Sequence, residues 1–252
     1  MEVSTHFGGS SATFELKHAI LLYEDAGRAV AATTHKIANY HGRPTITAGQ
    51  PITVSALEQL IQSLGKSSGA TFLPTEILSL GIERMVWWCP AGRRRIWFKP
   101  NGRFDKNQSP EQAAETKALL KLNGQFVQWP AFLFVASHGL SAFAMARSER
   151  PKPDTHLLKA PCWNLNDGGM CAGNIELPSV SPDNLAGFEN AFFNSSFTHN
   201  SQGGKLTTHP GGHTGLWTEL AARKTAPDTS YWRKHLLRTN HTVQSVIKNH
   251  HE

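Results

Sequence analysis

Short apolar runs separated by turn residues fill the chain between residues 83 and 147, and they constrain the fold more than any other feature. The runs read ERMVWWCP, RRRIWFKP, GQFVQWPAFLFVAS and LSAFAMAR. Runs of this length bounded by Gly, Pro or Ser are typical of strands, and short connections between them favour antiparallel pairing. We therefore expect an antiparallel β-meander. Its tryptophans, Trp87, Trp88, Trp97 and Trp129, are expected in the core as cross-strand pairs rather than on a peptide-binding surface.

The segments on either side of the meander mix strand and helix patterns. FELKHAILLYED and RAVAATTHKIA predict a hairpin joined at residues 24–27, and leucines at helical spacing predict a helix that begins after Thr53 or Ser55 and ends at Gly65. The other expected elements are a helical turn in 72–81, a helix over 109–122 capped by Ser109, an extended proline-rich arm over 148–161, a helix over 182–194, a glycine-rich loop over 201–215, and basic helical segments over 216–224 and 229–251.

Together these elements predict an α+β fold in three regions. Residues 1–80 form a hairpin and helix extension, residues 81–200 form the core that contains the meander, and residues 201–252 form the glycine-rich loop and the basic helical tail. No internal repeat interrupts this order.

The chain carries neither a membrane pattern nor an export pattern. Its longest apolar stretch, PAFLFVASHGLSAFAMA, is broken by polar residues and glycine, which fits two strands better than a spanning helix. MEVSTHFGGSSATFELK lacks the features of a secretory signal. An odd set of cysteines, Cys89, Cys162 and Cys171, favours free thiols over a disulfide framework. We expect a cytoplasmic protein without a membrane partner.

The charge of the chain favours an acidic partner. The formal net charge is +6, and Arg233, Lys234, His235 and Arg238 cluster near Trp232 on an expected helix. Such a cluster contacts phosphates or an acidic protein surface, or else forms a solvated helix face, which is the commoner case. Arg93, Arg94 and Arg95 alternate between the faces of an expected strand and make no single stripe.

Metal-ligand spacing is absent from the cysteine and histidine pattern. Cys162 and Cys171 lie nine residues apart, so neither belongs to a CxxC pair. His209 and His213 form an HxxxH, but Pro210 and two glycines between them prevent the helical turn that would align both rings. We expect no metal and no cofactor.

Cys171 has neighbours that suit a reactive thiol. Small residues flank it in GGMCAG, and such residues let another main chain approach the sulfur. Asn164 and Asn166 supply carboxamide donors for an oxyanion, and His199 is the candidate to lower the thiol pKa or to accept a proton. The alternative is a buried, inert cysteine, which is common for free thiols.

The order of these elements resembles the ubiquitin-conjugating enzyme core. In that core a meander and a proline-rich segment precede a His-Pro-Asn turn and a Gly-x-x-Cys that carries a thioester. Gly168-Gly169-Met170-Cys171 matches the Gly-x-x-Cys, while Pro161 and Asn164 match the Pro-Asn loosely and Ala160 stands in place of the histidine.

The chain is more specifically similar to the bacterial conjugating-enzyme-like family D, known as protein B of plasmid-borne PRTRC cassettes. Members of that family lack the histidine before the cysteine and carry one after it, a role that His199 fits. FLPTEIL, WWCPAGRRRIWF, RPKPDTHLLKAP and GGMCAGNIELP carry this likeness, which covers most of residues 14–200.

The resemblance implies a cysteine-dependent acyl transferase that carries a ubiquitin-like protein. Cys171 would hold the thioester, Asn164 or Asn166 would stabilise the oxyanion, and His199 would assist proton transfer. The implied partners are the ubiquitin-like protein, a ThiF-type activating enzyme and a JAB-type metallopeptidase. Two alternatives stay open: a docking platform in which Cys171 is structural, and a basic DNA-associated plasmid-maintenance factor.

Overall fold

The chain divides into two compact units, residues 1–72 and residues 73–252. The structure, a computed structural model, describes residues 16–26, 28–53, 56, 73–81, 83–99, 109–173, 175–201 and 204–248. None of the helices in these ranges is long and apolar enough to cross a membrane.

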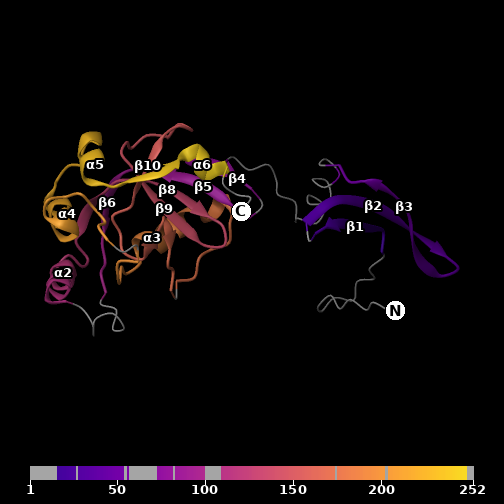
Figure 1. Cartoon of the computed structure of the whole chain (residues 1–252), viewed down its shortest axis with the longest axis horizontal. Helices are drawn as coiled ribbons and strands as arrows, with labels where there is room; N and C mark the ends of the chain where they lie inside the picture. The colour runs from indigo at the N-terminus through magenta and orange to yellow at the C-terminus, as the bar shows by residue number, and fades with distance from the viewer. Residues whose placement is uncertain are drawn as a thin grey trace. The chain divides into compact units, whose positions relative to one another are not determined.

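The first unit contains a three-stranded antiparallel sheet in the order β1-β2-β3 (Figure 1). β1 (His18–Asp25) and β2 (Arg28–Tyr40) confirm the expected hairpin. β3 (Arg43–Pro51) was not expected; it follows a tight turn in which His41 and Gly42 both have positive φ, 51° and 77°. That pair of angles is typical of the turns that join twisted antiparallel strands.

The described part of the first unit buries very little. His35 is its one buried residue, held by a hydrogen bond from Nδ1 to the Thr47 carbonyl at 2.8 Å. The helix expected after Thr53 or Ser55 lies almost wholly outside the described residues. Ala56, which is helical, donates its backbone N–H to the Thr53 hydroxyl at 3.2 Å, as a capping threonine requires.

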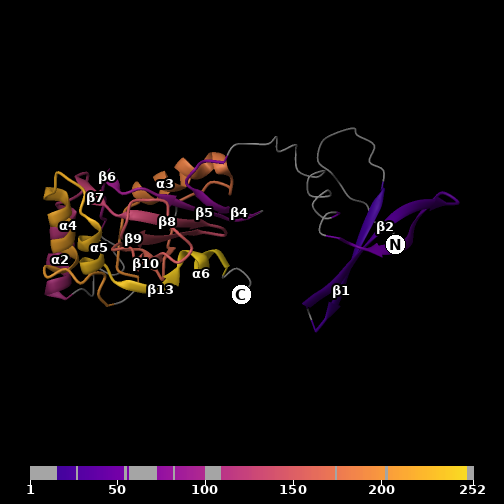
Figure 2. The same ribbon diagram turned by 90° about the horizontal axis from the view of Figure 1, so that it is seen from above.

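The second unit is built on an antiparallel sheet with the strand order β11-β12-β9-β8-β5-β4, to which β10 and β13 are added beside β9 (Figures 1 and 2). These strands are β4 (Ile77–Leu80), β5 (Met85–Cys89), β8 (Ala131–Ala136), β9 (Leu140–Met145), β10 (His156–Lys159), β11 (Leu165–Asn166), β12 (Gly169–Met170) and β13 (Arg238–Thr242). A separate pair joins β6 (Gly92–Arg95) to β7 (Phe126–Trp129). The fold is α+β, and the expected antiparallel meander is confirmed for β5, β8 and β9, whereas β6 and β7 pair with each other outside this sheet.

The helical turn expected in residues 72–81 is wrong. Ile77–Leu80 form the edge strand β4, which pairs with β5 through Leu80 and Met85. Ile77 is buried against the apolar core, so pairing with the long apolar strand beside it overrides the short local pattern.

The helices pack on both faces of this sheet. They are α2 (Pro110–Leu120), the 3₁₀ turn η2 (Pro182–Asn184) with α3 (Leu185–Phe193), α4 (Gly212–Ala222), α5 (Thr229–His235) and α6 (Val243–Lys248). Ser109 caps α2 with the reciprocal bonds of a capping box to Gln112, as expected. The helix expected over 182–194 is also confirmed, as η2 and α3.

Alternate residues of the central strand β8 face different helices. Phe132 and Phe134 lie against Phe192 of α3, with ring centroids 5.3 and 5.2 Å apart, while Leu133 belongs to the cluster that contains Val246 of α6. Figures 1 and 2 show α3 and α6 on opposite sides of the sheet. A strand covered on both faces is apolar at every position, which explains the continuous run AFLFVA.

The tryptophans of the meander are mainly core residues. Trp87 and Trp129 are fully buried, and Trp129 packs 4.7 Å from Trp217 of α4. Trp88 and Trp97 are partly exposed. The core interpretation is therefore confirmed for Trp87 and Trp129.

The C-terminal residues differ from the continuous helix expected over 229–251. α5 ends at His235, and Arg238–Thr242 form β13, which pairs with β10 before α6 begins. Thr239 also donates its hydroxyl to the Leu157 carbonyl at 2.9 Å. Pairing with the edge of β10 that β9 does not cover, a strand far away in sequence, overrides the local helical pattern of this segment.

Candidate functional site

Cys171 lies at the surface, directly after a β-hairpin whose turn has two residues. β11 and β12 pair through Asn166 and Gly169, and the connecting residues Asp167 and Gly168 have positive φ of 44° and 86°. An Asp-Gly pair is the preferred sequence for such a turn. Gly168 also packs against Phe143, whose ring occupies the place of any Cβ. The hairpin geometry therefore depends on the glycines that precede the cysteine.

The three cysteines lie in different surroundings. Cys171 is exposed, whereas Cys89 and Cys162 are buried. Burial raises the pKa of Cys89 to about 12, with the nearby Glu189 as a further cause, and burial raises the pKa of Cys162 well above its usual value. Both buried thiols are held in the protonated, unreactive form. Cys171 is thus the cysteine that an incoming protein can reach.

Asn164 lies between Cys171 and His199 in the hydrogen-bond network. The Cys171 N–H donates to the Asn164 carbonyl at 2.7 Å, and the Asn164 N–H donates to the His199 carbonyl at 2.9 Å. The main chain of Asn164, with a left-handed φ of 61°, therefore joins the cysteine loop to the segment after α3. Three of the expected site residues are brought together in this way.

The carboxamide of Asn164 is already occupied by structural bonds. Its Oδ1 accepts from the backbone N–H of Thr198 at 3.0 Å, from the Thr198 hydroxyl at 2.8 Å and from the His199 N–H at 3.3 Å. Its Nδ2 donates to the Ser196 carbonyl at 3.1 Å, and the residue is buried. The two backbone donors fix which end of the amide is oxygen. Asn166, by contrast, is exposed on β11.

The same network sets the tautomer of His199. The Thr198 hydroxyl has one proton, which goes to Asn164 Oδ1 because that oxygen only accepts. His199 Nδ1, 2.9 Å from the Thr198 oxygen, must then be the donor in their bond. A neutral ring with its proton on Nδ1 keeps its lone pair on Nε2, which lies 3.2 Å from the Ser201 hydroxyl. The chain Asn164–Thr198–His199 thus prepares Nε2 as an acceptor.

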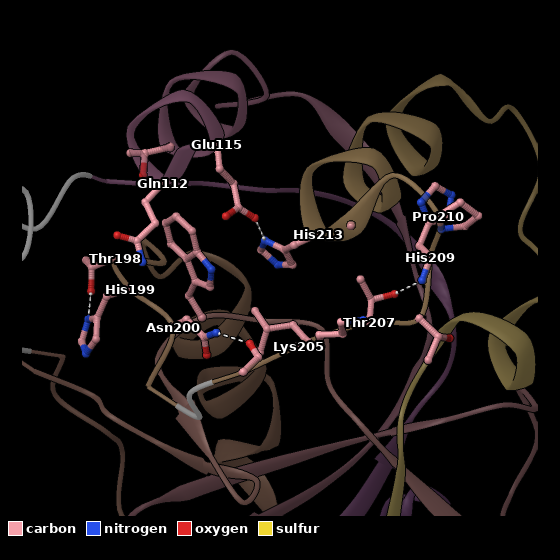
Figure 3. A pocket seen from close by; sticks show the side chains of 16 residues that line it. Gln112, Glu115, Thr198, His199, Asn200, Lys205, Thr207, His209, Pro210 and His213 are labelled. Carbon is pink, nitrogen blue, oxygen red and sulfur yellow. Dashed lines mark hydrogen bonds and ion pairs between the residues drawn. The ribbon is translucent and has the colours of Figure 1, made fainter. Parts of the chain in front are cut away.

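His199 also lines a cavity with a volume of about 1010 Å³. Figure 3 shows Glu115 of α2 and His213 of α4 facing each other there, with Lys205 and Asn200 on the opposite side. The His213 Nδ1 and the Glu115 Oε1 are 3.9 Å apart, and burial raises the pKa of Glu115. Cys171 is not among the residues that line this cavity.

α4 anchors the loop that leads to Asn164. The Pro161 carbonyl accepts from His213 Nε2 at 2.9 Å and from the Trp217 indole N–H at 3.1 Å. Because a carbonyl oxygen only accepts, this bond requires the His213 proton on Nε2, and the Trp217 indole N–H, whose nitrogen also lies 2.9 Å from Nε2, then donates to Pro161. Burial lowers the pKa of His213 to about 4, so the ring is neutral at pH 7, and its Nδ1 is buried without a hydrogen-bond partner.

His209 and His213 do not act as a pair of ligands. His209 precedes α4 and its ring accepts from the Gly211 N–H and bonds Glu219 at 2.9 Å, while His213 lies inside α4. His209 first, and Arg223 second, lower the pKa of Glu219 to about 2. Within the described ranges, no group of three or more His, Cys, Asp or Glu side chains is placed to hold a metal ion.

Sequence reasoning missed the roles of three residues that organise the site. Thr198 was not singled out, and a threonine beside a histidine carries no signal of its own. His213 was considered only as a metal ligand, whereas its role is to hold Pro161. Trp163, which stacks on His213 with ring centroids 5.6 Å apart, was missed as well.

Comparison with known proteins gives one match. The model of prokaryotic E2 family D matches residues 55–239, nearly three quarters of the 252-residue chain. The matched range includes the meander, the Cys171 hairpin, the His199 segment and α4. No curated protein and no solved structure matches the chain.

Proposed function

The chain belongs to prokaryotic E2 family D, and from this premise we propose that it carries a ubiquitin-like protein as a thioester on Cys171 and passes it to an acceptor. The observation that carries the proposal is the contrast between the cysteines: Cys171 is exposed directly after the β11–β12 hairpin, and the other two are buried. A cysteine with only a structural role is expected to be buried, as Cys89 and Cys162 are.

Loading consists of one exchange of thioesters. The Cys171 thiolate attacks the carbonyl carbon of the modifier's C-terminal thioester on the activating enzyme. A new bond forms between Sγ and that carbon, and the bond to the enzyme's sulfur breaks, so that its thiolate leaves. No oxidant or reductant is needed because one thioester replaces another.

Transfer consumes the thioester. An acceptor amine attacks the same carbonyl, its N–C bond forms, and Cys171 leaves as a thiolate. The amine loses a proton in this step, and His199 Nε2 is the atom that takes it because Nδ1 already carries a proton directed to Thr198. Thr198 and Asn164 are then positioning residues that orient the base.

Asn166 is the better of the two candidate asparagines for the oxyanion. Asn164 uses its amide to hold Ser196, Thr198 and His199, and it is buried. Asn166 is exposed and pairs with Gly169, which stands two residues before Cys171. Loss of such a donor costs on the order of a hundredfold or more in rate.

The partners follow from the resemblance to the PRTRC cassette. A ubiquitin-like protein supplies the acyl group, a ThiF-type enzyme activates it with ATP, and a JAB-type metallopeptidase removes it. The protein would act beside them in the bacterial cytoplasm.

The test is adduct formation with the purified modifier, activating enzyme and ATP. We expect the native chain to form an adduct that a reductant cleaves, Cys171→Ala to form none, and Cys171→Ser to form an ester that the reductant leaves intact. Cys162→Ala, which removes a buried thiol, is the matched control and keeps the adduct. Equal adducts in the Cys171→Ala and Cys162→Ala proteins, or no adduct in the native chain, would favour the docking-platform alternative.

A further inference from the structure

A second cavity, which neither the β11–β12 hairpin nor Cys171 lines, lies where the proline-rich arm meets the C-terminal segment. Its volume is about 520 Å³. β10 pairs with β13, with Leu158 opposite Arg238, and this pairing brings the arm beside α5 and β13 (Figure 2). The end of β9 completes the wall. Two separate segments of the chain, residues 145–158 and 233–238, therefore build one concave surface.

The wall of this cavity carries an excess of positive charge. Arg147, Lys152, Arg233 and Arg238 line it together with the carboxylates Glu149 and Asp154. Arg147 and Glu149 neutralise each other in an ion pair of 3.2 Å.

The remaining groups leave two positive charges without a counter-ion. Lys152, Arg233 and Arg238 face a single carboxylate, Asp154. In the described ranges the side chains of these three cations make neither an ion pair nor a hydrogen bond. A phosphomonoester carries between about −1.5 and −2 charges at pH 7, so its charge matches this excess better than a carboxylate does. The planar fork of each arginine binds phosphate oxygens in pairs.

The base of the cavity is apolar. Met145 and Leu158 are almost fully buried and line it, beside Ala146 and Pro151. An apolar floor beneath a cationic rim fits a small organic molecule that bears a phosphate, and the volume lies within the range of ligand pockets.

An extended nucleic-acid surface would need a stripe of cations. The other arginine run does not supply one: Arg93 and Arg95 lie over the Phe126 ring, and Arg94 lies over the Phe193 ring at 4.3 Å. Lys152, Arg233 and Arg238 gather instead around one concavity.

We infer that this cavity is a binding site for a small organic phosphomonoester. Lys152, Arg233 and Arg238 hold the phosphate, and the apolar floor contacts the organic part. This site is separate from the Cys171 hairpin and does not depend on the proposed transfer reaction.

Calorimetric titration of the full chain tests the inference, with adenosine 5′-monophosphate as probe and adenosine as its counterpart without phosphate. We expect the monophosphate to bind and adenosine not to bind. Arg233→Gln and Arg238→Gln should each weaken binding about tenfold or more. Lys234→Gln removes an equal charge from the same helix but from a residue outside the cavity, and it should leave binding unchanged.

Several outcomes would overturn the inference. Absence of monophosphate binding, equal binding of adenosine, or an equal loss in Lys234→Gln would each do so. Tight binding of duplex DNA that displaces the monophosphate and weakens steeply with salt would assign the cluster to nucleic acid instead. All substituted residues are exposed, and circular dichroism verifies that each variant is folded.

Discussion

At the scale of single residues, His213 shows how burial fixes a protonation state. The ring is enclosed between Trp163 and Trp217, and Nε2 donates to the Pro161 carbonyl. Taking a charged imidazolium out of water is unfavourable, and the bond to Pro161 offsets only part of that cost, so the pKa falls to about 4. The His213 imidazole is therefore uncharged in the folded state at neutral pH.

This shift predicts a loss of stability in mild acid. The unfolded chain binds a proton at His213 below pH 6.5 while the folded chain does not until about pH 4, so stability falls as the pH decreases through this window. Between pH 7 and pH 5 the change is about 2 kcal/mol. His213→Gln, whose amide can still donate to Pro161, should remove that part of the pH dependence. Urea unfolding at the two pH values measures it, and an unchanged pH dependence in the variant would contradict the assignment.

The pH window in which Glu219 loses its contribution to stability lies lower and overlaps that of His213 only between about pH 4 and pH 4.5. Its pKa falls to about 2 because His209 and Arg223 bond the carboxylate. Stability from this group is complete above pH 4.5 and is lost as the pH falls toward 2. The unfolding measurements at pH 7 and pH 5 therefore leave Glu219 ionised in the folded state.

At the scale of elements, the β11–β12 hairpin depends on glycine for two separable reasons. Gly168 has φ of 86° and its missing Cβ leaves room for the Phe143 ring, whereas Gly173 has φ of 57° and nothing within 4 Å. Backbone strain acts at both positions, but steric overlap acts only at Gly168.

We therefore expect Gly168→Ala to be more destabilising than Gly173→Ala. The strain common to both is about 1–2 kcal/mol, and displacement of Phe143 adds to it in Gly168→Ala alone. Thermal unfolding compares the two variants, and the yield of the Cys171 adduct should follow the same order. Equal melting temperatures would show that Phe143 yields to the added methyl group without cost.

The elements that sequence reasoning found are those whose signals are local. Ser109 and Gln112 indicate the start of α2 in the sequence, and the runs that form β8 and β9 are almost wholly apolar. β4 and β13 were mistaken for helix because their state is decided by partners distant in sequence, β5 and β10. Local propensity predicts the structure of a segment poorly when that segment can pair with the exposed edge of a sheet.

The candidate site likewise contains residues that could be selected from the sequence and contacts that could not, because they join distant segments. Cys171 could be selected because glycines and a proline-rich arm surround it in the sequence, and His199 could be selected by resemblance to a family. The hydrogen bonds of Asn164 could not be predicted from the sequence. They require its φ of 61° and the proximity of residues 196–199, which follow α3 in the chain. The anchoring of Pro161 by α4 joins residues more than fifty positions apart.

At the scale of the whole molecule, the apolar core of the described residues lies in the second unit. In the described part of the chain, every buried apolar side chain falls between Ile77 and Val246. The exposed strands of the first unit carry apolar residues such as Leu22 and Tyr40, with exposures of 66% and 62%. The free energy that stabilises the Cys171 hairpin, α3 and α4 therefore comes from residues 73–252.

A fragment of residues 73–252 should consequently fold without the first unit. It contains both faces of the sheet, the helices that cover them and the anchoring of Pro161 by α4. We expect its main thermal transition to lie within a few degrees of that of the full chain, with the same near-ultraviolet circular dichroism from the buried Trp87, Trp129 and Trp217. A matched deletion that ends at residue 237 removes β13 and α6, leaves the β10 edge and the Val86–Leu133 face uncovered, and should melt at clearly lower temperature. If the longer fragment is unfolded while the full chain is folded, residues 1–72 contribute to the core in a way that this division into units does not allow.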